Sequence, residues 1–195
     1  MHQASDDRPA WRRVVAGPVH RFDDAVDRAA DRLRGEPRLD RLMYTLSELG
    51  DWSLLWHLLA WGGAWRAGRH DVRAAAAVSA CLGVESALVN GGVKRLLPRN
   101  RPVWTSETAR PHRLRTPRTT SFPSGHASAA MVAATLLAAR QPRWRLAYYL
   151  LAGLVGASRV HVRIHHASDV AAGWGLGALI GVAARRACAQ AVRPR

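Results

Sequence analysis

Three short stretches of this chain carry residues that can handle a phosphate group. They are residues 94–102 (KRLLPRNRP), residues 123–126 (PSGH) and residues 158–169 (SRVHVRIHHASD). Phosphoryl transfer needs a nucleophile, a proton donor for the leaving oxygen and positive charge around the equatorial oxygens. The stretches contain all three kinds of group, so phosphoryl transfer is the chemistry that they indicate.

The positive charge and the hydrogen-bond donors have clear candidates. Lys94, Arg101 and Arg159 can supply the charge, since arginine binds two phosphate oxygens with its planar fork and lysine acts as a point charge. Ser124 and Gly125 precede an apolar run that is typical of a helix. Backbone N–H groups at such a helix start attract an anion, because the helix dipole favours negative charge there.

The nucleophile and the proton donor are histidines. A neutral imidazole can attack phosphorus when a carboxylate holds its far nitrogen. His165 and Asp169 are four residues apart, about one helical turn, so their side chains can face each other. His126 is then the candidate general acid. The alternative is a metal site, because His161, His165 and Asp169 are also spaced by four.

The stretches lie at the ends of apolar segments, which must position them. Several of these segments are shorter than the ~20 apolar residues of a membrane span, but their helices can extend into flanking polar residues. Alternating directions bring the three stretches to one face of an up-and-down bundle. We therefore expect an all-α transmembrane bundle of about five spans, with a soluble all-α bundle as the alternative. The segments cover residues 42–65, 74–93, 124–139, 144–158 and 169–184.

The chain divides into three parts. Residues 1–41 are charged, residues 42–188 are expected to form one membrane domain, and residues 189–195 are a basic tail. The first part contains apolar residues three and four apart, which predict an amphipathic helix on the membrane surface or against the bundle. These residues are Val19, Phe22, Val26, Ala29 and Leu33.

Small residues give two further expectations. Gly173, Gly177 and Gly181 are each four apart in the last apolar segment, which predicts close approach of another helix. Cys81 and Cys188 lie far apart in apolar stretches, and we expect buried small side chains and no disulfide framework.

The chain is strongly basic, with 29 Lys and Arg against 14 Asp and Glu and a formal net charge of +15. Such a balance suits nucleic acid, an anionic membrane surface or a phosphorylated substrate. No aromatic platform or nucleic-acid motif accompanies the charge, and the arginines cluster beside apolar segments. We therefore expect a membrane bilayer as partner and no nucleic acid.

Together the three stretches resemble the type 2 phosphatidic acid phosphatase (PAP2) superfamily, which includes vanadium haloperoxidases and bacterial lipid phosphatases. The signature of that family is Kx6RP, PSGH and SRx5Hx3D, and the resemblance covers residues 42–184. It implies a PAP2/haloperoxidase-like helical core. All three parts are present in order and spacing, as Lys94 with Arg101 and Pro102, Pro123 to His126, and Ser158 and Arg159 with His165 and Asp169.

The resemblance also implies a role for each site residue. His165 is the nucleophile that forms a phosphohistidine, His126 is the acid, and Asp169 orients His165. Hydrolysis in this family requires no metal, and no other cofactor is expected. The residues implied to bind phosphate are Lys94, Arg101, Ser124, Gly125 and Arg159.

The implied function is that of a multi-pass cell-membrane phosphatase acting on a phosphomonoester or diphosphate of a polyprenyl or glycerophospholipid. One alternative is a vanadate-dependent haloperoxidase-like enzyme in which His165 binds vanadium. The other is a non-catalytic membrane protein that binds anionic lipid. Two orientations stay open: a cytoplasmic N-terminus puts the site in the cytoplasm, whereas arginine-rich loops on the opposite face favour the reverse.

Overall fold

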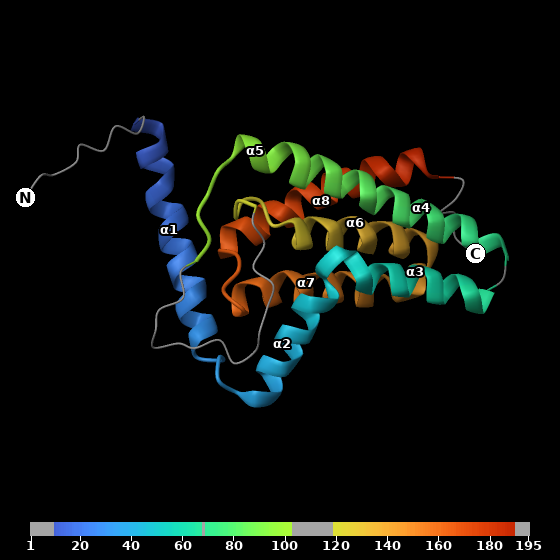
Figure 1. Ribbon diagram of the computed structural model, residues 1–195, viewed down its shortest axis with the longest axis horizontal. Coiled ribbons are helices and arrows are strands. Elements are labelled where there is room, and N and C mark those ends of the chain that lie inside the picture. The colour runs from blue at the N-terminus through green and yellow to red at the C-terminus, as the bar shows by residue number, and fades with distance from the viewer. Residues whose placement is uncertain (1–9, 68, 103–118, 190–195) are drawn as a thin grey trace, which may run out of the picture.

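The computed structural model describes residues 10–67, 69–102 and 119–189, and this part of the chain contains helices and no strand (Figure 1). The expected all-α fold is confirmed. Parts of the charged N-terminus, the basic connection and the basic tail lie outside the described residues. The long helices are α1 (Ala10–Asp31), α2 (Pro37–Leu49), α3 (Leu54–Ala67), α4 (Arg69–Ser86), α6 (Gly125–Arg140), α7 (Arg145–His161) and α8 (Ala167–Ala187).

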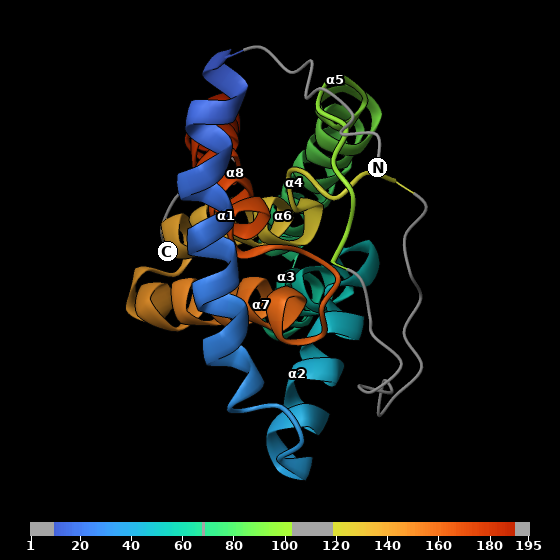
Figure 2. The ribbon, with the colours of Figure 1, turned by 90° about the vertical axis from the view of Figure 1, so that its left-hand side faces the viewer.

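Helix α6 is the centre of the bundle, with α8, α7 and α4 packed around it (Figure 2). It is made mostly of alanine and other small or apolar residues, and between Ala127 and Ala138 every side chain except that of Met131 is buried. A helix that is apolar on all sides is expected in such a position. Its N-terminus therefore has a fixed place relative to three neighbouring helices.

The glycine row of α8 packs directly against α6. A Cβ atom added at Gly173 would lie 2.5 Å from the Ser124 carbonyl oxygen, and one at Gly177 would clash with the Ser128 carbonyl oxygen. Only glycine fits at this distance between two backbones. The predicted close helix approach is confirmed, and it brings the start of α8 beside the start of α6.

Helix α4 continues through a π-helical segment, Ala87–Val93, into the short α5 (Lys94–Leu96). Such segments alter the direction in which the following side chains point and are frequent at functional sites. Lys94 directly follows this segment, and its side chain is buried. The irregularity thus places a cation inside the end of the bundle.

The expectation of one continuous span over residues 42–65 is wrong. Helices α2 and α3 are separated by a single turn, Asp51–Ser53, in which Trp52 and Ser53 have φ angles of 55° and 57°. Residues with a side chain rarely adopt this left-handed conformation, so the α-helix cannot continue through it. The apolar residues on both sides of the turn led to the prediction of one span, although Gly50 and Asp51 are residues common in turns.

The N-terminal amphipathic helix is present as α1, and it lies against the bundle. It crosses one end of the other helices at a steep angle and contacts α7 and α8 (Figures 1 and 2). Its apolar residues line a cavity of about 360 Å³ with these helices, and Phe22 and Leu33 stay half exposed. Asp23, in contrast, is buried in the contact.

Two helical segments of the described residues, Asp71–Leu96 and Ala167–Ala187, are long and apolar enough to cross a membrane. They correspond to the second and fifth predicted spans. Cys81 of α4 lies close to Cys188, which directly follows α8: their Sγ atoms are 3.6 Å apart, and both residues are half-buried. The expectation of buried side chains is therefore corrected to half-buried ones, and both cysteines are free thiols.

Candidate active site

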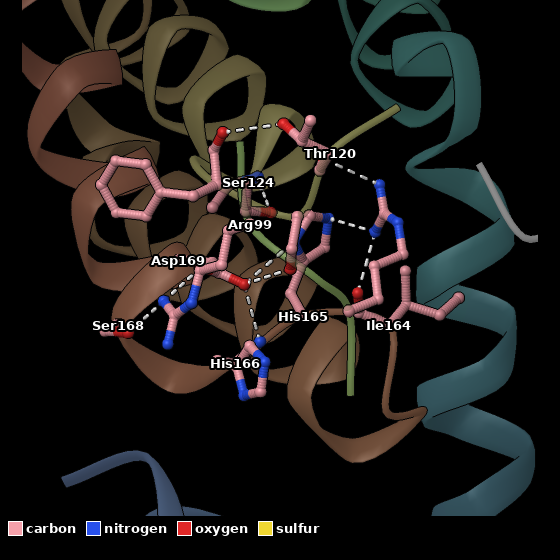
Figure 3. Close-up of polar contacts among 12 residues, drawn as sticks. Arg99, Thr120, Ser124, Ile164, His165, His166, Ser168 and Asp169 are labelled. Atoms are coloured by element: carbon pink, nitrogen blue, oxygen red, sulfur yellow. Dashed lines mark hydrogen bonds and ion pairs between the residues drawn. The ribbon is translucent and has the colours of Figure 1, made fainter. Parts of the chain in front are cut away.

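The three sequence stretches meet at the end of the bundle that α1 crosses (Figure 3). Arg101, which follows α5, donates a hydrogen bond of 3.3 Å to His165 Nε2 in the α7–α8 connection. The Ser124 N–H at the start of α6 donates to the Asp169 carbonyl oxygen at 2.9 Å. The expected convergence on one face is confirmed, whereas the roles of the residues stay predictions.

The hydrogen bonds of His165 indicate which of its nitrogens carries the proton. Arginine can only donate, so His165 Nε2 must accept from Arg101 with its lone pair. The proton of the neutral ring is then on Nδ1, which faces Asp169 Oδ2 at 3.6 Å and Ser121 Oγ at 3.5 Å. This tautomer places a lone pair and no proton on Nε2, as a nucleophilic nitrogen requires.

The surroundings of His165 keep its ring neutral. Burial lowers its pKa to about 3, the nearby carboxylate of Asp169 opposes this change, and the nearby charges of Arg159 and Arg101 lower the pKa further. The imidazole is therefore unprotonated at neutral pH, which is the form that a nucleophile requires.

Asp169 is fully buried and is held by more groups than the sequence predicted. Its Oδ2 accepts from the Ser121 hydroxyl and from the His166 N–H at 2.9 Å. Its Oδ1 accepts from Arg99 Nη1 at 2.6 Å. Ser121 and Arg99 were missed because neither belongs to the signature. A carboxylate with these partners is fixed in position and ionised.

Two of the cations are buried inside the site. Arg159 is 1% exposed, and its Nη1 donates to the hydroxyl and the carbonyl oxygen of Ser47 on α2. Its Nε and Nη2 have no hydrogen-bond partner among the described residues. Leaving donors of a buried cation unpaired is costly, so these atoms fit an anion bound beside them. Lys94 is 5% exposed and donates to Thr119 Oγ1 at 3.3 Å.

The start of α6 supplies backbone donors. The Ser124 hydroxyl accepts from the Ala127 N–H at 3.4 Å and so caps the helix. A hydroxyl can donate at the same time, which leaves its proton for a ligand. The N–H groups of Gly125 and His126 occupy the first helical positions, where no partner exists within the helix. A Cβ atom at Gly125 would lie 3.0 Å from Asn90 Oδ1, so glycine fits this position.

His126 is held by a residue that the sequence reasoning missed. Its Nε2 lies 2.8 Å from Asp51 Oδ1, in the turn between α2 and α3. A Cβ atom at Gly50 would lie 2.7 Å from the His126 ring, so the backbone of the turn also contacts the histidine. The adjacent glycine and aspartate, which are common in turns, were the available signal.

The alternative metal site is not assembled. His161 Nε2 pairs with Asp40 Oδ1 of α2 at 2.7 Å, and both side chains are buried, whereas His165 faces Asp169. Over residues 10–67, 69–102 and 119–189, no group of three His, Cys, Asp or Glu side chains could hold a metal ion.

The fold and the site together define a helical-bundle protein. One end of the bundle carries positively charged side chains that can bind an anion, next to a buried His–Asp pair. The sequence model of the PAP2 superfamily matches residues 74–193, which is more than half of the chain. The chain therefore belongs to the PAP2 superfamily. Helices α1, α2 and α3 precede the matched region.

Two solved structures of bacterial proteins are similar in fold to this chain. One is a transmembrane PAP2-type phosphatidylglycerolphosphate phosphatase from Bacillus subtilis, with a TM-score of 0.64, 24% identity, and coverage of 89% of this chain and 87% of that chain. The other is LpxE from Aquifex aeolicus, with a TM-score of 0.65, 24% identity, and coverage of 83% and 93%. A comparison with curated proteins gives no match.

Proposed function

We propose that the protein is a multi-pass membrane phosphatase that removes phosphate from a polyprenyl or glycerophospholipid through a phosphohistidine. The observation that carries this proposal is the state of His165. It is a neutral imidazole whose Nε2 lone pair lies against Arg101, with its Nδ1 side directed at Asp169. PAP2 membership and the likeness to membrane phosphatases support the reaction class.

In the first step, His165 Nε2 forms a bond to phosphorus while the bond between phosphorus and the lipid oxygen breaks. The proton on Nδ1 is directed at Asp169, whose negative charge stabilises the positive charge that develops on the ring. Protonated His126 gives its proton to the leaving oxygen from Nδ1, because its Nε2 is bound to Asp51. The phosphoryl oxygens are stabilised by Lys94, Arg101, Arg159 and the α6 N–H groups.

In the second step, water attacks the phosphohistidine. Neutral His126 takes a proton from the water as the new oxygen–phosphorus bond forms, and the bond between phosphorus and His165 Nε2 breaks. Inorganic phosphate leaves, His126 is protonated again and His165 returns to its neutral form. The cycle uses residues of this chain and water only.

A membrane position is supported by the outer faces of the helices. Large apolar side chains are exposed at helical spacing along them, and Leu146 on α7 and Trp65 on α3 are 72% and 89% exposed. Such a surface is unfavourable in water and favourable in lipid. The exposed residues are Leu54, Leu58, Trp61 and Trp65 on α3, Leu146, Leu150 and Leu154 on α7, and Leu179 and Val182 on α8.

The test is phosphate release by the purified protein in detergent from a panel of lipids. The panel contains phosphatidate, phosphatidylglycerophosphate, a polyprenyl diphosphate and a polyprenyl-phosphoryl pentose phosphate, each with and without EDTA. We expect release from at least one lipid, unchanged by EDTA and absent in His165→Ala. Brief turnover with a 32P-labelled lipid followed by an alkaline quench should retain label on the wild-type protein.

Two results would contradict the proposal. Phosphate release that persists in His165→Ala would assign the nucleophile to another group. Bromide oxidation after vanadate loading, without release from any lipid, would favour the haloperoxidase alternative.

A further inference from the structure

Arg99 lies between two buried carboxylates that come from opposite ends of the chain. Its Nη1 donates to Asp169 Oδ1 at 2.6 Å and to Ser168 Oγ at 2.7 Å (Figure 3). Its Nη2 donates to Asp23 Oδ2 at 2.6 Å. Asp169 and Asp23 are 0% and 5% exposed. The planar fork of arginine can bridge two carboxylates in a fixed geometry, which lysine cannot do.

Asp23 also holds the start of α8 directly. Its Oδ1 accepts from the Ser168 N–H at 2.7 Å, and its Oδ2 accepts from the Ser168 hydroxyl at 2.9 Å. Ser168 precedes Asp169 in the first helical turn, where backbone N–H groups lack intrahelical partners and a carboxylate is favourable. Helix α1 therefore fixes both the backbone and the side chain next to Asp169.

We propose that Arg99 and Asp23 are positioning residues for the His165–Asp169 pair, so that helix α1 is a functional part of the active site. The inference rests on the proposed function. A fixed, ionised Asp169 keeps the proton of His165 on Nδ1 and the lone pair on Nε2. Arg99 supplies the charge that holds Asp169 in this state, and Asp23 holds Arg99 in its orientation.

The remaining bonds of Arg99 agree with this role. Its carbonyl oxygen accepts from the Ser121 N–H at 2.9 Å, and the Ser121 hydroxyl donates to Asp169 Oδ2. One residue thus reaches both oxygens of the carboxylate, directly and through Ser121. Arg99 is no part of the PAP2 signature, and Asp23 precedes the region matched by the family.

The first test is Asp23→Asn, with Asp24→Asn as matched control. Asp24 is the next residue of α1 and is exposed. We expect Asp23→Asn to lower kcat about tenfold with KM changed less than twofold, because loss of an orienting partner typically costs 10- to 100-fold. The control should match the wild type. Equal kcat in all three proteins would overturn the proposal.

The second test separates orientation from general stability. Arg99→Gln should lower kcat about 100-fold, and Arg99→Lys should restore part of it, since lysine returns the charge without the bridge. In an Arg99→Gln background, Asp23→Asn should lower kcat by a smaller factor than in the wild type, because part of its effect passes through Arg99 and only its bonds to Ser168 remain. Independent, multiplicative losses would contradict a shared path.

The third test is the pH profile. Without the Arg99 charge, Asp169 is protonated more readily, so the acidic limb of kcat/KM should move to higher pH in Arg99→Gln and stay in place in Asp24→Asn. A variant that only unfolds would lose amplitude without this shift. The charged or titratable groups that face Asp169 are His165, Lys94, Arg99, Arg101 and, through Arg99, Asp23.

Orthovanadate binding tests the positioning role of Asp23 independently of lipid hydrolysis. Vanadate bonds to a histidine nitrogen in the place of phosphate, so its affinity reports the orientation of His165 without turnover. If no lipid is hydrolysed, the proposed reaction fails, but weaker vanadate binding by Asp23→Asn than by Asp24→Asn still supports the positioning role. Equal affinities would overturn that role.

Discussion

The core helices α4 to α8 and the N-terminal helices α1 and α2 contribute to the site in different ways. The core carries every signature residue, from Lys94 to Asp169. The N-terminal region carries none, yet three of its contacts reach a signature residue or the arginine that holds one. These contacts are Asp23 with Arg99, Ser47 with Arg159, and Asp51, in the turn that follows α2, with His126.

The difference shows that the proposed reacting groups and the groups that orient them come from separate parts of the sequence. The proposed reacting groups lie on short stretches at the ends of core helices, so their spacing is visible in the sequence. The supporting groups lie far from their partners in the sequence: Asp51 is 75 residues from His126, and Ser47 is 112 residues from Arg159. Changes to the site residues of the core should therefore abolish the reaction, whereas changes to the supporting residues of the N-terminal region should only lower its rate.

The largest effect is expected for His165→Gln. Loss of the nucleophile should lower kcat by about four orders of magnitude or more, as for other nucleophiles that act within a unit. The matched variant is His161→Gln, which removes the other buried histidine with an aspartate partner. In His161→Gln, phosphate release per folded molecule should stay within about threefold of the wild type. Similar losses in both variants would mean that His165 acts only through the fold.

A smaller effect is expected for Asp51→Asn. Asparagine cannot stabilise the protonated His126 ring, so kcat on a lipid substrate should fall about 10- to 100-fold. A substrate with a good leaving group, such as p-nitrophenyl phosphate, needs less proton donation and should be affected much less. Glu48→Gln, an exposed change on α2, is the control. Equal losses on both substrates would show that Asp51 has no link to leaving-group protonation.

The sequence predicted the local part of this architecture and missed the long-range part. The Kx6RP, PSGH and SRx5Hx3D stretches and the glycine row of α8 follow from short spacings. The turn at Asp51–Ser53 was missed because apolar residues continue on both sides of it. The Asp23–Arg99 contact was missed because Asp23 is one of many charges on an amphipathic helix, and only the packing of α1 shows that it is buried.

The N-terminal region should also contribute stability without chemistry. Asp40 accepts from His161 Nε2 at 2.7 Å and from the Gly35 N–H at 3.0 Å. Asparagine has only one acceptor oxygen, so Asp40→Asn leaves either His161 Nε2 or the Gly35 N–H without this partner and should lower the free energy of unfolding by about 1–3 kcal/mol. Denaturation in detergent measures this loss. Phosphate release per folded molecule should be unchanged, and a proportional fall in kcat would place Asp40 in the machinery.

The smallest effect is a pH dependence of stability that separates the two regions. His165 has a pKa lowered to about 3 in the folded chain by burial, against about 6.5 for an unfolded histidine. Below pH 6.5 the unfolded state binds a proton that the folded state does not, so this stabilisation is present above pH 6.5 and declines as the pH falls toward 3. The melting temperature of the wild type should fall a few degrees more between pH 7 and pH 5 than that of His165→Gln.

His20→Gln, which changes an exposed histidine of α1, should follow the wild type. If His165→Gln had the same pH dependence as the wild type, the folded chain would bind a proton at His165 as readily as the unfolded one, and the neutral nucleophile would have to be abandoned.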